Sequence, residues 1–385
     1  MRRAGWGAVA GLLVAVVVAG CAPSAGPAPN APTTQRTPSA TPTPTPTLDP
    51  AEAAVAQMSV EQRARSVVMG HVPGTDTTVL RDYMSSGLGG FILMSDNISG
   101  GPDQVRAVTA ALTVDPQLPP LIAIDQEGGV VSRLSWDALP AGRGLQSADA
   151  ASVESAFAGR AELVAAVGAN VNFGIIADVP LGPTSFIASR ALGTDADSAA
   201  TRVRAAVQGE KGIVLSTLKH FPDHGAAPGD SHHLIPTTDV PLEKWRTADA
   251  KPFIAGIDAG AELLMFGHLA YTAVDAAPAS LSARWHAIAR DELGFDGVMI
   301  TDDLGMLSSS GVAAYHDPVA NAVHAIVAGN DMVLMVAGAD AETAPAIVKG
   351  LVAAVADGRL PAPRLDDAAT RVMELRMRSA TAQAR

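Results

Sequence analysis

The chain has 385 residues, which is too long for one average hydrophobic core but suits a single α/β barrel with appended segments. Its formal charge of −12 leaves no excess of cations to neutralise a phosphate backbone, so the composition argues against a nucleic-acid partner. Hydrophobic residues make up 48% and charged residues 17%, as in a chain that folds around a sizeable core. The one cysteine, Cys21, excludes an intramolecular disulfide and a metal site built from several thiolates.

The N-terminus has the pattern of a targeting signal. Arg2 and Arg3 precede an apolar stretch at residues 8–19, which is too short to span a bilayer but has the length of a signal-peptide core. The stretch leads into Val-Ala-Gly-Cys at residues 18–21, which resembles the lipobox of bacterial lipoproteins. The resemblance implies that residues 1–20 are a lipoprotein signal peptide and that Cys21 is lipidated. An ordinary signal peptide with an incidental cysteine is the alternative.

Lipidation at Cys21 would determine where the protein is found. Burial of acyl chains contributes about 0.8 kcal/mol per CH₂ group, so we expect an extracytoplasmic protein that is lipid-anchored to the bacterial cell membrane. The anchor would be its only contact with the membrane.

Residues 21–50 are rich in Pro and Thr and include Thr-Pro-Thr-Pro-Thr-Pro at 41–46. Such a segment favours extended polyproline II conformations of about 3.1 Å per residue, so we predict a stiff linker that ends at residue 50.

Residues 51–385 alternate short apolar, β-branched runs with longer alanine-rich amphipathic stretches, the order of repeated βαβ units. Strands that are apolar on both faces are typical of a parallel sheet buried on both sides. The predicted strands are 67–72, 89–94, 121–124, 171–177, 214–218, 263–266, 298–301 and 332–336. The predicted helices include 152–167, 195–210, 243–259, 284–293, 313–328 and 341–356.

These eight strand and helix units predict the α/β class and, within it, a single (β/α)₈ TIM-type barrel. An open doubly wound sheet is the alternative, but no Gly-x-Gly-x-x-Gly follows an early strand. Polar residues gather directly after the apolar runs, where all parallel strands of a barrel open onto one face. We therefore expect one pocket to receive Asp125, Asp178, Lys219, His220, His268, Asp302 and Asp303.

A second group of polar residues follows the fifth predicted strand. Residues 219–225 read Lys-His-Phe-Pro-Asp-His-Gly, and a Gly/Pro/Ala loop then leads to Asp-Ser-His-His at 230–233. In a turn, Asp230 could orient His232 for general acid/base catalysis, although Asp-x-His alone is a common pattern. The histidines also raise the question of a metal site. Pro222 disrupts the helical geometry that would bring His220 and His224 onto one face, so we predict neither a metal nor another cofactor.

At these residues the chain resembles a known family. Residues 219–232 are similar to the K-H-F-P-G-H-G-x(4)-D-[ST]-H signature of bacterial family 3 glycoside hydrolases of the NagZ type, which are β-N-acetylglucosaminidases. Residues 291–306 resemble the nucleophile motif of that family, and Asp-Gln-Glu-Gly-Gly at 125–129, ending in Arg133, resembles its sugar-binding loop. The three motifs occur in the family's order, and the resemblance covers residues 51–385.

The resemblance assigns roles to individual residues. It makes Asp302 the nucleophile, His232 the general acid/base and Asp230 the orienting partner of His232. The side chains implied to hold the sugar are Asp125, Arg133, Arg190, Lys219 and His220. The chain departs from the family pattern twice: Asp223 occupies a position that usually has glycine, and Val130 one where arginine is common.

The implied activity is that of a retaining exo-β-N-acetylglucosaminidase acting on terminal non-reducing β-linked N-acetylglucosamine, with a muropeptide or oligosaccharide from peptidoglycan as the expected carbohydrate partner. A neutral imidazole would not repel phosphate as a carboxylate would, so phosphorolysis at the same site is one alternative. A surface sugar-binding barrel without turnover is a second. A metal-dependent deacetylase or amidohydrolase on the same barrel is a third.

Overall fold

The computed structural model describes residues 15, 17, 19–22, 26 and 49–383. The chain divides into two units, Met1–Thr47 and Leu48–Arg385. The predicted signal peptide and linker lie largely outside the described residues, although Cys21 is described and has an exposed, free thiol. None of the described helices combines the length and apolar character that crossing a membrane requires.

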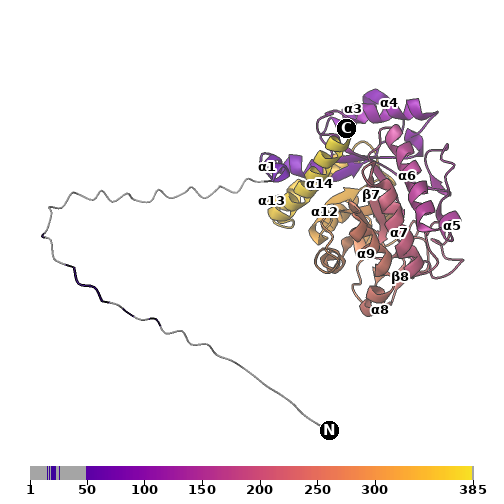
Figure 1. The fold of residues 1–385 in the computed structure, drawn as a ribbon. Coiled ribbons are helices and arrows are strands. Elements are labelled where there is room, and N and C mark those ends of the chain that lie inside the picture. Colours follow the sequence, from indigo (N-terminus) through magenta and orange to yellow (C-terminus); the bar gives the residue numbers. More distant parts are fainter. Residues whose placement is uncertain (1–14, 16, 18, 23–25, 27–48, 384–385) are drawn as a thin grey trace, which may run out of the picture. The chain divides into compact units, whose positions relative to one another are not determined.

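The second unit is a closed eight-stranded barrel in which every strand is parallel to both neighbours (Figure 1). The strands follow chain order around the barrel, and the last pairs with the first, so the (β/α)₈ prediction is confirmed. All eight predicted strands are present. They are β1 Val68–Gly70, β2 Gly90–Leu93, β3 Leu121–Ile124, β6 Val171–Ile176, β7 Leu215–Phe221, β9 Leu263–Phe266, β11 Val298–Asp303 and β12 Met332–Leu334.

Helices surround the barrel and are connected to the strands by loops (Figure 1). Asp149 and Asp195 cap two of the longest by accepting hydrogen bonds from backbone amides of the first turn. The helices are α1 Pro50–Ala56, α2 Val60–Ser66, α3 Thr77–Met84, α4 Pro102–Leu112, α5 Gly142–Leu145, α6 Ala150–Ala166, α7 Ala196–Glu210, α8 Leu242–Thr247, α9 Ala250–Ala259, α10 Ala283–Ala287, α11 Leu304–Ser309, α12 Pro318–Ala328, α13 Thr343–Ala356 and α14 Ala362–Gln383. Short strands β4 Gln126–Gly128 and β5 Val131–Ser132 form a hairpin after β3, and β8 Thr237–Thr238 pairs with β10 Ala270–Tyr271.

The barrel interior is a packed core, to which all eight barrel strands contribute buried side chains. Helix α14 closes the end of the barrel where the strands begin. Its Val372 and Leu375 belong to the interior core, and Arg376 donates to the carbonyls of Leu118 and Pro119, just before β3. One end of the barrel is therefore plugged, and the other, where the strands end, is left for chemistry.

Several predicted boundaries were wrong. The single helix expected at 243–259 is two helices, α8 and α9, because Pro252 lacks a backbone N–H and is accommodated in the first turn of α9. The helix expected at 284–293 is α10 followed by a π-helical turn, Ile288–Glu292. The helix expected at 313–328 is a 3₁₀ turn, Ala313–Tyr315, and then α12, which begins at Pro318.

Strand β7 continues through Phe221, so that Lys219 and His220 lie within the strand and not after it.

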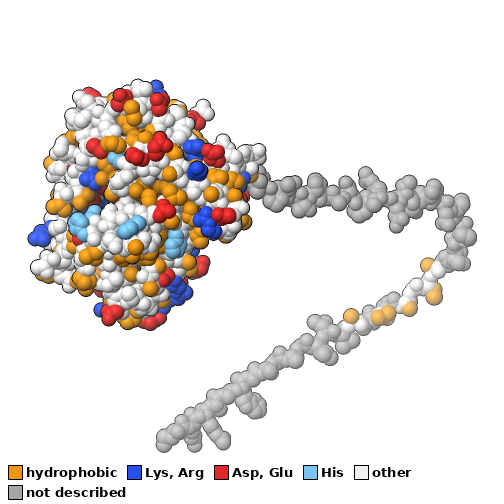
Figure 2. All heavy atoms as spheres, turned by 180° about the vertical axis from the view of Figure 1, so that it is seen from behind, with side chains coloured by type: hydrophobic (Ala, Val, Ile, Leu, Met, Phe, Trp, Pro, Cys, Tyr) orange, Lys and Arg blue, Asp and Glu red, His pale blue; other side chains and the backbone are white. Residues whose placement is uncertain are grey.

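On the face shown in Figure 2, Lys and Arg side chains are scattered among acidic and hydrophobic ones and do not form a stripe. That face therefore lacks the basic footprint that tracks a nucleic-acid backbone.

Candidate active site

Asp125 follows β3 and is held between two cations. Lys219 Nζ donates to Asp125 Oδ1 at 2.9 Å, and Arg133 Nη2 donates to Oδ2 at 3.1 Å. Burial alone would raise the pKa of Asp125, but Lys219 and Arg133 outweigh it and lower the pKa to about 2. Three of the predicted sugar-binding residues therefore form one charged cluster, and Asp125 is ionised at neutral pH.

Glu127 connects this cluster to Arg190. The Arg190 guanidinium donates to both Glu127 oxygens, at 2.8 and 2.7 Å, and Lys219 Nζ lies 2.9 Å from Oε1 of the same carboxylate. Sequence reasoning assigned no role to Glu127. A signal was available, because Glu127 lies two residues after Asp125 and residues two apart share one side of an extended segment.

Asp178, which follows β6 and is fully buried, orients His220. Its Oδ2 accepts from His220 Nδ1 at 2.8 Å, and its Oδ1 accepts from the backbone amides of His220 and His224 at 3.1 and 2.7 Å. Burial raises the pKa of Asp178, but His220 and then His224 lower it by more, so the residue is a carboxylate. A carboxylate on Nδ1 fixes that nitrogen as a hydrogen-bond donor and sets the orientation of the His220 ring.

Asp302 lies near the end of β11 and is partly exposed. Burial raises its pKa, whereas His220, His268 and Lys219 lower it by more, so the pKa lies below the ordinary value for aspartate. The backbone N–H of Asp303 donates to Asp302 Oδ1 at 2.8 Å. The strand therefore presents an ionised carboxylate at the open end of the barrel.

The neighbouring Asp303 has a different environment. Its side chain accepts from the backbone amides of Gly305, Val336 and Ala337 at 2.9, 2.7 and 2.8 Å, which caps α11 and attaches β11 to the segment after β12. Burial raises the pKa of Asp303. Both side-chain oxygens of Asp303 therefore accept backbone hydrogen bonds, whereas in Asp302, within the described part of the chain, only Oδ1 does.

The Asp–His loop, which we define as residues 222–236, connects β7 to β8. His232 Nδ1 lies 2.5 Å from Asp230 Oδ1, which also accepts from the His232 backbone amide at 3.0 Å, so the predicted contact is present. Their side chains are 57% and 35% exposed, respectively. Burial raises the pKa of Asp230, but hydrogen bonds from His232 lower it by more. Among the described residues no hydrogen bond or ion pair joins His232 to Asp302.

The two departures from the family pattern lie in different places. Asp223 is fully buried, and its Oδ1 accepts from the backbone amides of Val179 and Gly225, each at 2.9 Å. Burial and the carboxylate of Asp178 raise the pKa of Asp223. Val130, in contrast, is 74% exposed between β4 and β5. Asp223 is therefore a structural tie between two loops and does not join the Asp125 cluster.

Residues 41–375, most of the chain, match the family model described as "Glycosyl hydrolase family 3 N terminal domain". The chain belongs to glycosyl hydrolase family 3. It is 36% identical over 278 residues to a beta-hexosaminidase of Xanthomonas oryzae pv. oryzae, covering 69% of this chain and 81% of the relative. It is 37% identical over 258 residues to a beta-hexosaminidase of Xylella fastidiosa, covering 64% of this chain and 75% of the relative.

Solved structures of the family have the same fold. A family 3 beta-N-acetylglucosaminidase from Paenibacillus sp. str. FPU-7 gives a TM-score of 0.77 at 31% identity; the match covers 84% of this chain and 63% of the Paenibacillus chain, less than two thirds of its length. A beta-N-acetylhexosaminidase from Beutenbergia cavernae DSM 12333 gives 0.74 at 30% identity and covers 83% of this chain and 99% of that one. The present chain is thus a family 3 glycoside hydrolase, and the region that matches the family model contains all the residues of the candidate active site described above.

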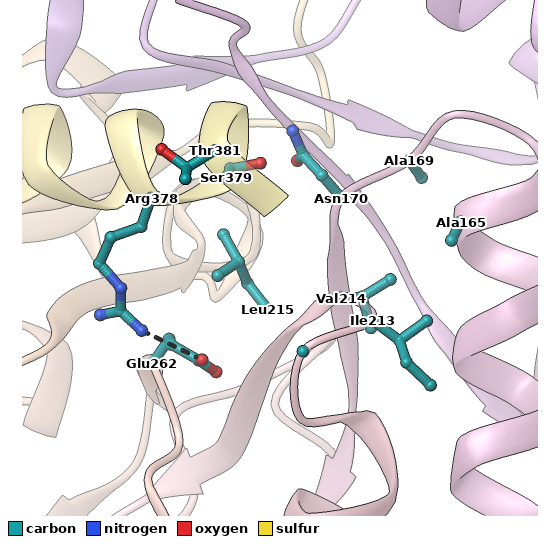
Figure 3. Close-up of a pocket in the computed structure, with 11 residues that line it drawn as sticks. Ala165, Ala169, Asn170, Ile213, Val214, Leu215, Glu262, Arg378, Ser379 and Thr381 are labelled. Atoms are coloured by element: carbon teal, nitrogen blue, oxygen red, sulfur yellow. Dashed lines mark hydrogen bonds and ion pairs between the residues drawn. The ribbon is translucent and has the colours of Figure 1, made fainter. Parts of the chain in front are cut away.

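A cavity of about 720 Å³ lies at the end of the barrel where the strands begin, opposite to the candidate active site (Figure 3). Asn170, Val214 and Glu262, which line it, immediately precede β6, β7 and β9, and Arg378 of α14 pairs with Glu262 at 3.3 Å. None of the predicted site residues lines this cavity.

Among the described residues no group of three or more His, Cys, Asp or Glu side chains is arranged to hold a metal ion.

Proposed function

We propose that the chain is a retaining exo-β-N-acetylglucosaminidase that hydrolyses terminal non-reducing β-linked N-acetylglucosamine. The observation that carries the proposal is that one structure contains both an ionised, partly exposed Asp302 on a barrel strand and a hydrogen-bonded Asp230–His232 pair on a loop. The similarity to beta-hexosaminidases supports the choice of sugar.

In the first step, a carboxylate oxygen of Asp302 attacks the anomeric carbon of the bound sugar. The bond from that carbon to the leaving oxygen breaks as protonated His232 transfers its Nε2 proton to this oxygen, and the alcohol departs. Nδ1 of His232 stays hydrogen-bonded to Asp230, so Nε2 is the nitrogen free to act. The product of this step is a glycosyl ester of Asp302.

In the second step, neutral His232 removes a proton from water, and the water oxygen attacks the same carbon. The ester bond breaks, Asp302 is regenerated, and two displacements at one carbon retain its configuration. The residues that would hold the sugar hydroxyls and N-acetyl group are Asp125, Arg133, Arg190, Lys219 and His220. Four tryptophans and few other aromatics in the whole chain favour a short pocket for one terminal sugar over a long polymer groove.

Covalent trapping tests this function directly. The enzyme is incubated with a fluorinated N-acetylglucosaminide, which slows hydrolysis of the intermediate, and is then digested for peptide mapping by mass spectrometry. We expect the label on Asp302. A label on another side chain would refute the proposed nucleophile. Absence of both a label and product from a chromogenic N-acetylglucosaminide would favour a sugar-binding barrel.

The acceptor in the second step is tested separately. We propose water, because free phosphate is of less use outside the cell membrane than within it. Product analysis in phosphate buffer and in a phosphate-free buffer decides the point: N-acetylglucosamine in both supports hydrolysis, and a sugar 1-phosphate in phosphate supports phosphorolysis.

The natural substrate and location are part of the same proposal. The Val-Ala-Gly-Cys sequence at 18–21 and the exposed thiol of Cys21 support a lipid anchor at the outer surface of the cell membrane. An enzyme placed there meets fragments of peptidoglycan, which we propose as the source of the sugar.

A further inference from the structure

The Asp–His loop is anchored at the residue between its two functional side chains. His232 is exposed and Asp230 partly exposed, but Ser231 is only 3% exposed. Ser231 Oγ lies 2.8 Å from Nε2 of His224, whose own exposure is 2%. The buried hydrogen bond thus lies directly under the exposed Asp–His pair.

His224 is itself attached to the barrel. Its backbone amide donates to Asp178 Oδ1 at 2.7 Å, and the same carboxylate orients His220 of β7. The His224 ring packs edge-on against His220, with centroids 5.8 Å apart, and lies tilted against Phe186, with centroids 5.4 Å apart. Burial and the adjacent His220 lower the pKa of His224, so the ring is neutral at neutral pH. Although His224 belongs to the Asp–His loop, its position is therefore fixed by Asp178, which follows β6, and by His220 of β7.

We propose that His224 and Ser231 are positioning residues, which hold the Asp–His loop so that His232 reaches the leaving oxygen of the substrate. This inference rests on the proposed role of His232 as general acid/base. Fixing Ser231 restricts the backbone on both sides of it, and hence the directions in which Asp230 and His232 project.

Phe186 adds a second contact at the same place. Its ring is T-shaped to His232 at 6.2 Å and also touches His224, so it links the anchor to the acid/base. Without the Ser231 hydroxyl, this aromatic contact alone would keep His232 near the barrel. Displacement of a proton donor by about 1 Å is enough to slow a reaction substantially.

The consequence is selective for the leaving group. A leaving oxygen that is already stable as an anion needs no proton, whereas a sugar or alkyl oxygen does. Loss of the anchor should therefore slow substrates with poor leaving groups and spare those with activated ones. A merely structural role for Ser231 would slow both kinds equally.

The test compares Ser231→Ala with wild type on a dinitrophenyl and a methyl β-N-acetylglucosaminide. We expect kcat/KM for the methyl glycoside to fall about tenfold, the equivalent of one hydrogen bond, while kcat/KM for the dinitrophenyl glycoside changes less than about twofold. Ser231→Thr, which keeps the hydroxyl, should restore most of the loss. Ser66→Ala, which removes a buried hydroxyl of α2 far from the loop, should not change the ratio.

An equal fall for both substrates, or no fall, would overturn the proposal. Ser231→Cys keeps the side-chain shape, with a slightly larger atom and a weaker hydrogen bond, and it provides the same comparison should the alanine variant fold poorly. His232→Ala is the reference: it must show the same selectivity more strongly. If His232→Ala slows both substrates equally, the proposed acid/base role of His232 is wrong. If His232→Ala slows the methyl glycoside selectively but no Ser231 variant does, only the proposed positioning role of Ser231 and His224 is wrong.

Discussion

Two adjacent aspartates show how environment decides the role of a side chain. Asp302 receives one backbone hydrogen bond and lies beside His220 and His268, whereas Asp303 receives three backbone hydrogen bonds and has a raised pKa. The sequence motif implied that the first of the two is the nucleophile. The hydrogen-bond pattern gives an independent physical reason for the same assignment.

Asparagine substitutions separate the two roles. Asp302→Asn should abolish turnover with little change in melting temperature, because the carboxylate charge is lost from a partly exposed position. Asp303→Asn places an amide N–H against backbone N–H groups, so it should reduce the free energy of unfolding by about 1–3 kcal/mol. Chromogenic assays and thermal unfolding of both variants check this. Near-normal activity of Asp302→Asn would remove the mechanism.

Glu210 predicts a pH dependence of stability away from the site. It is buried at the end of α7, Oε1 accepts from Asn172 at 2.6 Å, and Oε2 has no hydrogen-bond partner among the described residues. Burial raises its pKa from 4.5 to about 8. The folded state therefore retains a proton that the unfolded state loses, and the free energy of unfolding falls as pH rises from about 4.5 towards 8.

Glu210→Gln should remove this loss. Each pKa unit corresponds to about 1.4 kcal/mol. The free energy of unfolding of the variant minus that of wild type should therefore increase by a few kcal/mol, about two pKa units or more, between pH 4.5 and pH 7. Urea unfolding at several pH values measures the difference. The exposed Glu154→Gln on α6 serves as the control. Parallel pH profiles for Glu210→Gln and wild type would contradict the expectation.

At the scale of elements, the two ends of the barrel have separate tasks. The site residues follow or end β3, β6, β7 and β11, while α14 plugs the end where the strands begin. The apolar runs were sufficient to predict all eight strands. Strand β7 extends further than its apolar run because Lys219 and His220 pair with the buried carboxylates of Glu127 and Asp178, which a pattern of hydrophobicity does not reveal.

Helix α14 should contribute to stability but not to substrate binding. Leu375→Ala removes a side chain from the barrel interior and should lower the free energy of unfolding by about 2–5 kcal/mol. KM at a temperature where the variant is folded should match wild type, because the site lies at the opposite end. Urea unfolding and steady-state kinetics check this, with the exposed Thr381→Ala as the control. A changed KM would show that the two ends are coupled.

At the scale of the whole molecule, the fold was more predictable than the site. Repeated βαβ units leave few architectures, and motifs placed Asp125, Lys219, His220 and Asp302 at one end of the barrel. Asp178 was expected in the same pocket but without its partner His220, and Glu127 received no role, since both act by buried pairing with residues distant in the chain. The burial of Asp223 was equally hidden, because an isolated carboxyl is normally exposed.

The proposed lipid modification of Cys21 predicts how the full-length protein is distributed in the cell. Cys21→Ala should move it from the membrane fraction to the soluble fraction and abolish labelling by a radioactive fatty acid. Its kcat/KM for a soluble chromogenic substrate should stay within about twofold of wild type, because Cys21 is not among the site residues. Fatty-acid labelling of Cys21→Ala would place the lipid elsewhere.

The charged cluster around Asp125 has a consequence for sugar recognition. Asp125, Glu127, Lys219, Arg133 and Arg190 already hold one another before any sugar arrives. Their rotamer freedom is lost while the chain folds, so a ligand need not restrain them again. In the proposed function the cluster is thus preorganised, so that the ordering cost of binding falls on the sugar and not on these side chains.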